Sequence, residues 1–316
     1  MNSKRVGISF LLIVLVDFGF LLGMTVYYIA GGTGEISITA NLITAQLINI
    51  IPLFLVILIG RRKDRSEKIF RDVLGFRRIK ISTALMTILY TVLIMPLSTL
   101  ANAISMLFVD NAVNEIAGDV LNVPFVIMFS IMAVFGPFCE ELVFRGAFFR
   151  GFRKSGNIFG AVIMSALLFA IMHMNFNQAA YAVLLGIMMA LAAEATGSTT
   201  TSFLMHFIFN GQSVCLMYLS DRLDPELLAE EMEMTYTSQE MAFIIAVYLL
   251  LAVVCTSIAF CVVTWMASNE GKQNFLRTVW ASRKNRWEKL WSVCLIIAVS
   301  LALMYMIIME VLTAVL

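Results

Sequence analysis

Long apolar runs recur along the whole chain, and they constrain its fold more than any other feature. Each run has about 17 residues or more, which is enough to cross the hydrocarbon core of a bilayer as a helix. The runs cover residues 8–30, 41–60, 81–108, 123–150, 157–174, 179–195, 199–220, 241–267 and 291–316. We therefore expect an all-α, polytopic bundle of about eight or nine transmembrane helices, with residues 1–316 forming a single integral membrane domain.

The distribution of charge agrees with this interpretation. Only 14% of the residues are charged, whereas soluble globular proteins have about 25%. If the N-terminus is cytoplasmic and the chain crosses at every run, every Lys and Arg except Arg222 lies on the cytoplasmic side, as the positive-inside rule requires. The basic stretch 61–80 is then an anchor at the headgroups of the lipid bilayer, and we expect no nucleic-acid partner.

Charged residues interrupt the fourth run at "GPFCEELVFRGAFFRGF", residues 136–152. Charged groups at membrane depth cost about 2.5–3.5 kcal/mol each on insertion scales, so each needs a partner or a purpose. Glu141 and Arg145 are four residues apart, about 40° around a helix, and can form an ion pair. Glu140 points about 100° away from Glu141, so that pair leaves it free for another contact. Pro137 removes a backbone hydrogen bond just upstream.

The chain has only two histidines, His173 and His206, and both lie in apolar runs. Each has a partner four residues away on the same helix face: Phe169 for His173, and Asn210 for His206. At 1.5 Å per residue, Glu140 lies about 20 Å and His173 about 26 Å from the turn that joins their helices. His206 lies about 10 Å into its own run. These depths agree if the basic hairpin tip around Arg150–Lys154 projects into the cytoplasm, and they then predict a polar site roughly 10 Å below the cytoplasmic face, reachable by water from that side.

Three kinds of chemistry are open to such a site. A glutamate and a histidine can activate a water molecule, and a second histidine with an asparagine can stabilise a developing oxyanion. Zinc is an alternative, held by Glu140, His173 and His206. We expect no cofactor, because Glu141 is committed to its arginine and the sequence has no HExxH motif. A thiol enzyme using Cys139 ranks last, since an adjacent carboxylate and apolar surroundings disfavour a thiolate.

Three short motifs resemble those of the CAAX protease and bacteriocin-processing (CPBP) family of intramembrane glutamate endopeptidases. The family pattern is EExxxR, then FxxxH, then HxxxN or HxxxD, each on its own helix. Here the motifs read Glu140-Glu141-Leu-Val-Phe-Arg145, Phe169-Ala-Ile-Met-His173 and His206-Phe-Ile-Phe-Asn210. The resemblance covers residues 123–220, which we interpret as the catalytic core. The runs in 241–316 lie beyond it, as extra C-terminal helices of unknown role.

The resemblance implies a role for each motif residue. It implies that Glu140 and His173 activate the water, while His206 and Asn210 hold the oxyanion. It implies that three further residues shape the site, namely Glu141, Arg145 and Phe169. The expected substrate is a peptide or protein, either hydrophobic, lipidated or a leader peptide. Most family members are bacterial, which favours a bacterial plasma membrane.

Two functions without peptide cleavage compete with this hypothesis. The first is a membrane scaffold that regulates a partner such as a sensor or an exporter. Intact motifs disfavour it, because a scaffold has little reason to keep so many costly polar groups inside a membrane. The second is a transporter in which buried carboxylates relay protons, which Glu140-dependent uptake without cleavage would indicate.

Overall fold

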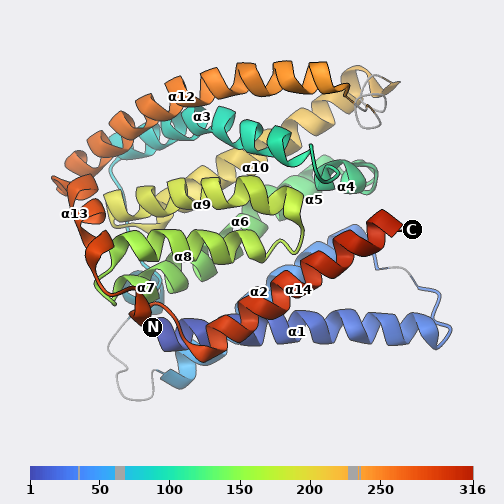
Figure 1. Ribbon diagram of the computed structural model, residues 1–316, viewed down its shortest axis with the longest axis horizontal. Coiled ribbons are helices and arrows are strands. Elements are labelled where there is room, and N and C mark those ends of the chain that lie inside the picture. Colours follow the sequence, from blue (N-terminus) through green and yellow to red (C-terminus); the bar gives the residue numbers. More distant parts are fainter. Residues whose placement is uncertain (35, 61–67, 227–233, 235, 316) are drawn as a thin grey trace.

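The computed structural model describes residues 1–34, 36–60, 68–226, 234 and 236–315, and every regular element in that part of the chain is a helix (Figure 1). Seven helical segments there are long and apolar enough to cross a membrane. They are α1 (Ser3–Ile29), α2 (Ile38–Gly60), α3 (Ile81–Ser105), the segmented helix Phe125–Arg153, α9 (Phe176–Thr196), α12 (Ser238–Asn269) and α14 (Val293–Val315). The predicted all-α membrane bundle is confirmed.

Two further helices correspond to the remaining predicted runs. Helix α10 (Thr199–Leu223) has 25 residues but is more polar than the seven. Helix α8 (Ile158–Ile171) is apolar but has 14 residues, so it extends only about 21 Å. It ends at Ile171, earlier than the predicted run 157–174, because Asn175 caps the next helix by accepting a hydrogen bond from the Gln178 N–H at 2.8 Å.

Shorter elements connect the long helices. They are η1 (Ile69–Val73), α4 (Ala112–Leu121), α13 (Phe275–Ala281), η4 (Ser282–Lys284) and η5 (Trp287–Lys289). Helix α4 follows α3, whereas α13, η4 and η5 lie between α12 and α14. None of these elements is long enough to cross a bilayer as a helix.

The predicted catalytic core lies in the middle of the bundle, between the pair α3 and α12 and the pair α1 and α14. Helices α8, α9 and α10 contact the segmented helix, and α8 runs along α9. Helix α12 packs along α3 on one side, whereas α14 packs along α1 on the other (Figure 1). The two C-terminal helices, whose place the sequence left open, therefore flank the core on opposite sides.

One end of the bundle is held together by basic side chains and the turn between α9 and α10. Arg150 Nη2 donates to the Gly197 carbonyl at 2.9 Å, and Arg153 forms a two-point ion pair with Glu194. Ser198 Oγ donates to the Arg77 carbonyl at 2.7 Å. Burial lowers the pKa of Lys272, whose ammonium donates to the Glu194 carbonyl in the same cluster. These contacts fix the start of α10, and with it the position of His206.

Gly186 lets α9 approach α8 closely. A Cβ atom at this position would lie 3.0 Å from both the Cα and the Cβ of Ala166, and 3.3 Å from Arg145 Nη2. Only glycine therefore fits without displacing a neighbour. Close approach of this kind is how small residues support helix packing in membranes.

Gly186→Ala is expected to lower the free energy of unfolding by about 1–3 kcal/mol, because the added methyl overpacks the contact between α8 and α9. Thermal unfolding of the purified protein in detergent measures the change. Gly19→Ala on α1 is the matched control, since nothing lies within 4 Å of its added Cβ. Equal unfolding midpoints for the two variants would contradict this account of the packing.

Candidate active site

The fourth predicted span is broken into alternating α and π segments. It runs through α5 (Phe125–Phe129), η2 (Ser130–Phe135), α6 (Gly136–Glu141), η3 (Leu142–Phe149) and α7 (Arg150–Arg153), in which η2 and η3 are π-helical. In the π register the Gly136 N–H donates to the Ile131 carbonyl, five residues back. π segments inside helices frequently occur at functional sites. Glu140 and Glu141 occupy the short α segment between two of them.

Glu141 and Arg145 form the ion pair that their spacing predicted. Arg145 Nη1 donates to Glu141 Oε1 at 2.7 Å, and both side chains are fully buried. The guanidinium carbon lies 4.3 Å from the centre of the Phe169 ring, which adds a cation–π contact. The pair is therefore part of the interior packing and has no direct access to substrate.

His206 lies between the two carboxylates. Its Nδ1 is 3.2 Å from Glu141 Oε1, and its Nε2 is 3.7 Å from Glu140 Oε2. The Glu140 side chain is 18% exposed, whereas that of Glu141 is not exposed at all. Adjacent glutamates thus have different surroundings, and Glu140 is the one that a solvent or substrate molecule can reach.

His173 lies in the turn after α8, and its ring is fixed by Phe169. Its Nδ1 is 2.9 Å from the Phe169 carbonyl oxygen. The Phe169 ring meets His173 edge-on at 4.9 Å and His206 edge-on at 5.6 Å. The Phe169 ring therefore packs against both histidines and against the buried arginine, and so separates them from one another. The contact through Nδ1 leaves Nε2 as the ring nitrogen of His173 for proton transfer.

Asn210 contacts the broken helix directly. Its Nδ2 donates to the Met132 carbonyl at 3.0 Å. In the π register this carbonyl would pair with the N–H of residue 137, but that residue is a proline and has no N–H. The Asn210 amide therefore satisfies an acceptor that the helix itself leaves open, a contact not foreseen in its predicted role as an oxyanion donor.

Asn210→Ala is expected to lower the free energy of unfolding by about 1–3 kcal/mol, because it leaves the Met132 carbonyl without its hydrogen bond. Thermal unfolding tests this, with Ser213→Ala as the control. Ser213 lies on the same helix, is exposed, and its hydroxyl donates only to the Phe209 carbonyl of its own helix. If Asn210→Ala is no less stable than this control, the Asn210 amide does not stabilise the segmented helix at the Met132 carbonyl.

Gln46 of α2 also reaches the site, and the sequence analysis did not identify it. Its Nε2 donates to Glu140 Oε1 at 3.0 Å. A glutamine at membrane depth is costly in the same way as a charged group, so the rule that singled out Glu140 could have identified it as well. No spacing rule links residue 46 to residue 140, because the two lie on different helices.

Two other features bear on the alternatives. Among the residues that the structure describes, no three His, Cys, Asp or Glu side chains come together in a way that could hold a metal ion. Cys139 is 1% exposed, which leaves its thiol without access to a substrate. Among the motif residues, the partly exposed side chains with acid–base chemistry are Glu140 and His173.

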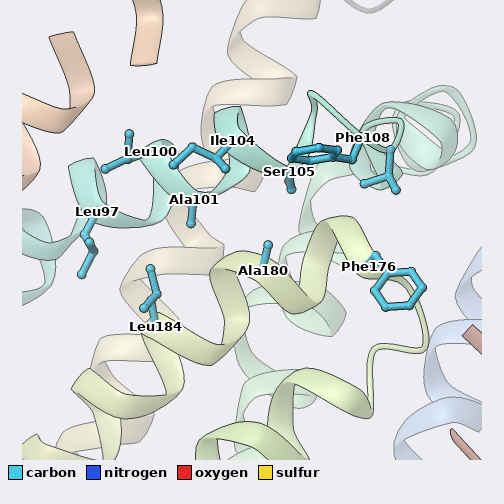
Figure 2. A pocket seen from close by; sticks show the side chains of 10 residues that line it. Leu97, Leu100, Ala101, Ile104, Ser105, Phe108, Phe176, Ala180 and Leu184 are labelled. Atoms are coloured by element: carbon cyan, nitrogen blue, oxygen red, sulfur yellow. The ribbon is translucent and has the colours of Figure 1, made fainter. Parts of the chain in front are cut away.

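An apolar pocket of about 490 Å³ lies between α3 and α9, and Figure 2 shows its lining. Leucines, alanines and phenylalanines form most of the wall, and Ser105 is its polar member. None of these side chains is an acid or a base at neutral pH. The pocket is therefore distinct from the cluster around Glu140 and does not carry the chemistry.

Comparison with known families agrees with this geometry. Residues 122–212 match the family model described as "Type II CAAX prenyl endopeptidase Rce1-like". This segment is Rce1-like. It contains all three motifs, and it matches the CPBP resemblance seen in the sequence. No curated protein and no solved structure matches the chain.

The Rce1-like segment supports a protease embedded in a membrane, acting on a peptide or protein. It covers less than a third of the chain, and the predicted core boundaries of 123–220 enclose nearly all of it. Helices α1, α2, α12 and α14 lie outside it. Gln46, on α2, thus contacts the motif residue Glu140 from outside the family segment.

Proposed function

We propose that the chain is an intramembrane glutamate endopeptidase, in which Glu140 and His173 activate the water that hydrolyses a peptide bond. The observation that carries the proposal is the position of Glu140. It is the partly exposed carboxylate of a cluster whose second carboxylate is fully buried and paired. A base must reach its water, whereas a supporting carboxylate need not.

The reaction proceeds in two balanced steps. In the first, the water oxygen bonds to the carbonyl carbon of the scissile peptide, and the water proton passes to Glu140 with His173 assisting. The carbonyl oxygen becomes an oxyanion, which the second N–H of the Asn210 amide and the Nε2–H of a His206 ring that carries a proton on both nitrogens stabilise. In the second, the proton passes to the peptide nitrogen and the carbon–nitrogen bond breaks. The products are a carboxylic acid and an amine, between which a proton then passes to give a carboxylate and an ammonium group, and Glu140 is ionised again.

Glu141, Arg145 and Phe169 position these groups in the proposed mechanism. Glu141 accepts a hydrogen bond from His206 Nδ1, which directs Nε2 of the same ring toward Glu140. Arg145 compensates the buried charge of Glu141. No metal takes part, and the zinc alternative through Glu140, His173 and His206 is an outcome of the test below.

The substrate in this proposal is a hydrophobic, lipidated or leader peptide that reaches the site from the cytoplasmic side of a bacterial plasma membrane. The basic end of the bundle, with Arg150, Arg153 and Lys272, faces the cytoplasm in this orientation, as the positive-inside rule favours. The N-terminus lies on the same side. A glutamate base about 10 Å below that face leaves the peptide bond close to water.

The purified protein, reconstituted in liposomes and given a panel of hydrophobic, lipidated and leader-type peptides, tests the proposal. Mass spectrometry identifies products, and a chelator arm tests for zinc. We expect cleavage that is insensitive to the chelator and absent in Glu140→Gln. Peptide uptake without cleavage would indicate a transporter, whereas no effect on any peptide would favour a scaffold. Loss of cleavage on chelation would contradict the metal-free mechanism and favour the zinc alternative.

A further inference from the structure

Gln46 is placed to act on Glu140 from a helix outside the Rce1-like segment. It lies on α2, which packs against α6 and both π segments. A Cβ on Gly136 would lie 3.7 Å from Gln46 Nε2, which is ordinary van der Waals distance, so the amide lies directly against α6. The contact between α2 and the catalytic helix is therefore close at this point.

The amide nitrogen of Gln46 fixes one oxygen of the Glu140 carboxylate. Glu140 Oε1 accepts from Gln46 Nε2 at 3.0 Å, while Oε2 is the oxygen near His206. Holding both oxygens defines the plane of the carboxylate, and with it the direction from which a water can be held. A carboxamide neither ionises nor competes for the proton, so it orients the base without replacing it.

The amide oxygen of Gln46 is the second observation. Gln46 Oε1 is buried and has no hydrogen-bond partner among the described residues. A buried acceptor without a partner is costly, and its cost disappears when a donor arrives. Because Nε2 is committed to Glu140, the oxygen of the same planar group lies beside the place where the reaction occurs. A peptide substrate brings main-chain N–H donors to that place.

We propose that Gln46 is a positioning and substrate-binding residue of this site: its Nε2 holds the Glu140 carboxylate, and its Oε1 accepts a main-chain N–H of the bound peptide next to the scissile bond. The inference rests on the proposed peptidase function. It extends the site to α2, and it assigns a main-chain N–H of the peptide as the donor to Gln46 Oε1.

The test compares Gln46→Met with wild type, using a synthetic peptide that spans a Glu140-dependent cleavage point. A series of ester-substituted versions replaces one N–H at a time. Gln46→Met keeps the length of the side chain but removes both amide functions. We expect kcat/KM on the parent peptide to fall about 10- to 100-fold, because a hydrogen bond to a charged group is lost. We also expect the ester at one position to lower kcat/KM of the wild-type protein about 3- to 10-fold. The same ester should not lower kcat/KM of Gln46→Met any further.

Asn41→Met is the matched control, because Asn41 is an exposed polar residue of the same helix. It is expected to stay within about twofold of wild type. If Gln46→Met does not fold, Gln46→Asn takes its place. Asparagine keeps the amide, but its side chain is one methylene shorter, which moves the amide away from Glu140. If Gln46 had only a structural role, the ester at that position would lower kcat/KM of Gln46→Met as much as it lowers that of the wild-type protein.

Two results would overturn the inference. One is a kcat/KM for Gln46→Met equal to that of Asn41→Met, and the other is the same ester penalty in wild type and Gln46→Met. Either could occur while Glu140→Gln remains inactive, which would leave the peptidase function standing. Cleavage that persists in Glu140→Gln would instead remove the proposed function itself, so the two failures are distinguishable.

Discussion

Replacing Arg145 with leucine is expected to lower the free energy of unfolding by about 3–5 kcal/mol, the largest stability change at this site. The reason is the Glu141 carboxylate, which is fully buried and receives its 2.7 Å hydrogen bond from this guanidinium. Without Arg145, a buried charge loses its compensating partner. The cation–π contact with Phe169 is lost as well. Thermal or denaturant unfolding in detergent measures the loss.

The double variant Glu141→Leu/Arg145→Leu separates charge from packing. Removing both partners leaves no uncompensated charge in the interior, and replacing a buried ion pair with apolar residues is often close to neutral. We expect the double variant to recover most of the stability that Arg145→Leu loses. A double variant as unstable as the single one, or an Arg145→Leu protein as stable as wild type, would show that the ion pair does not support the fold.

Glu140→Gln is expected to impair turnover and Glu141→Gln to impair stability, although the chemical change is the same and the residues are adjacent. Glu140→Gln should lower turnover by about 10²–10⁴-fold, the range for loss of a general base. Its stability should stay close to that of wild type, because the Glu140 side chain is partly exposed. Glu141→Gln should instead lower stability, since it leaves the fully buried Arg145 without its counter-charge.

Measuring turnover and the unfolding midpoint for both variants in the same detergent gives a two-by-two comparison. His206→Gln adds a useful third variant, because it removes the ring that lies between the two carboxylates. Equal turnover losses in Glu140→Gln and Glu141→Gln, with equal stability, would contradict the division of roles. It would mean that the buried and the exposed carboxylates are functionally equivalent.

Local spacing in the sequence predicted those parts of the site that depend on a single helix. Glu141 and Arg145 are one helical turn apart, and they pair as expected. Phe169 and His173 are also one turn apart, and their rings meet edge-on. The rise per residue, with the basic hairpin tip around Arg150–Lys154 projecting into the cytoplasm, predicted a common level for Glu140 and His206, and they lie 3.7 Å apart. Helix geometry is enough for such inferences.

The parts that could not be predicted depend on backbone register and on contacts between helices. Pro137 indicated a break, but the pattern of side chains does not reveal that π segments flank α6. The acceptor that Asn210 satisfies is a main-chain carbonyl freed by that register, so no residue type marks it. Gln46 comes from α2, and an apolar run does not say which neighbour it packs against.

The same limit applies to the two C-terminal helices. Hydropathy predicted both of them near their observed positions, although α12 extends to Ser238–Asn269 against the predicted 241–267. Nothing in their sequences predicted that α12 would pack on α3 and α14 on α1. The faces of these helices are almost uniformly apolar, so periodicity gives no preferred partner.

Glu140 is expected to enable the hydrolysis of peptide bonds in cells. The most direct test compares, by mass spectrometry, the peptides in cells that express wild-type protein or Glu140→Gln at equal membrane levels. We predict a defined set of cleavage products that is present with wild type and absent with Glu140→Gln. Identical peptide pools, with a cellular phenotype that persists in both strains, would contradict the peptidase account and favour a scaffold.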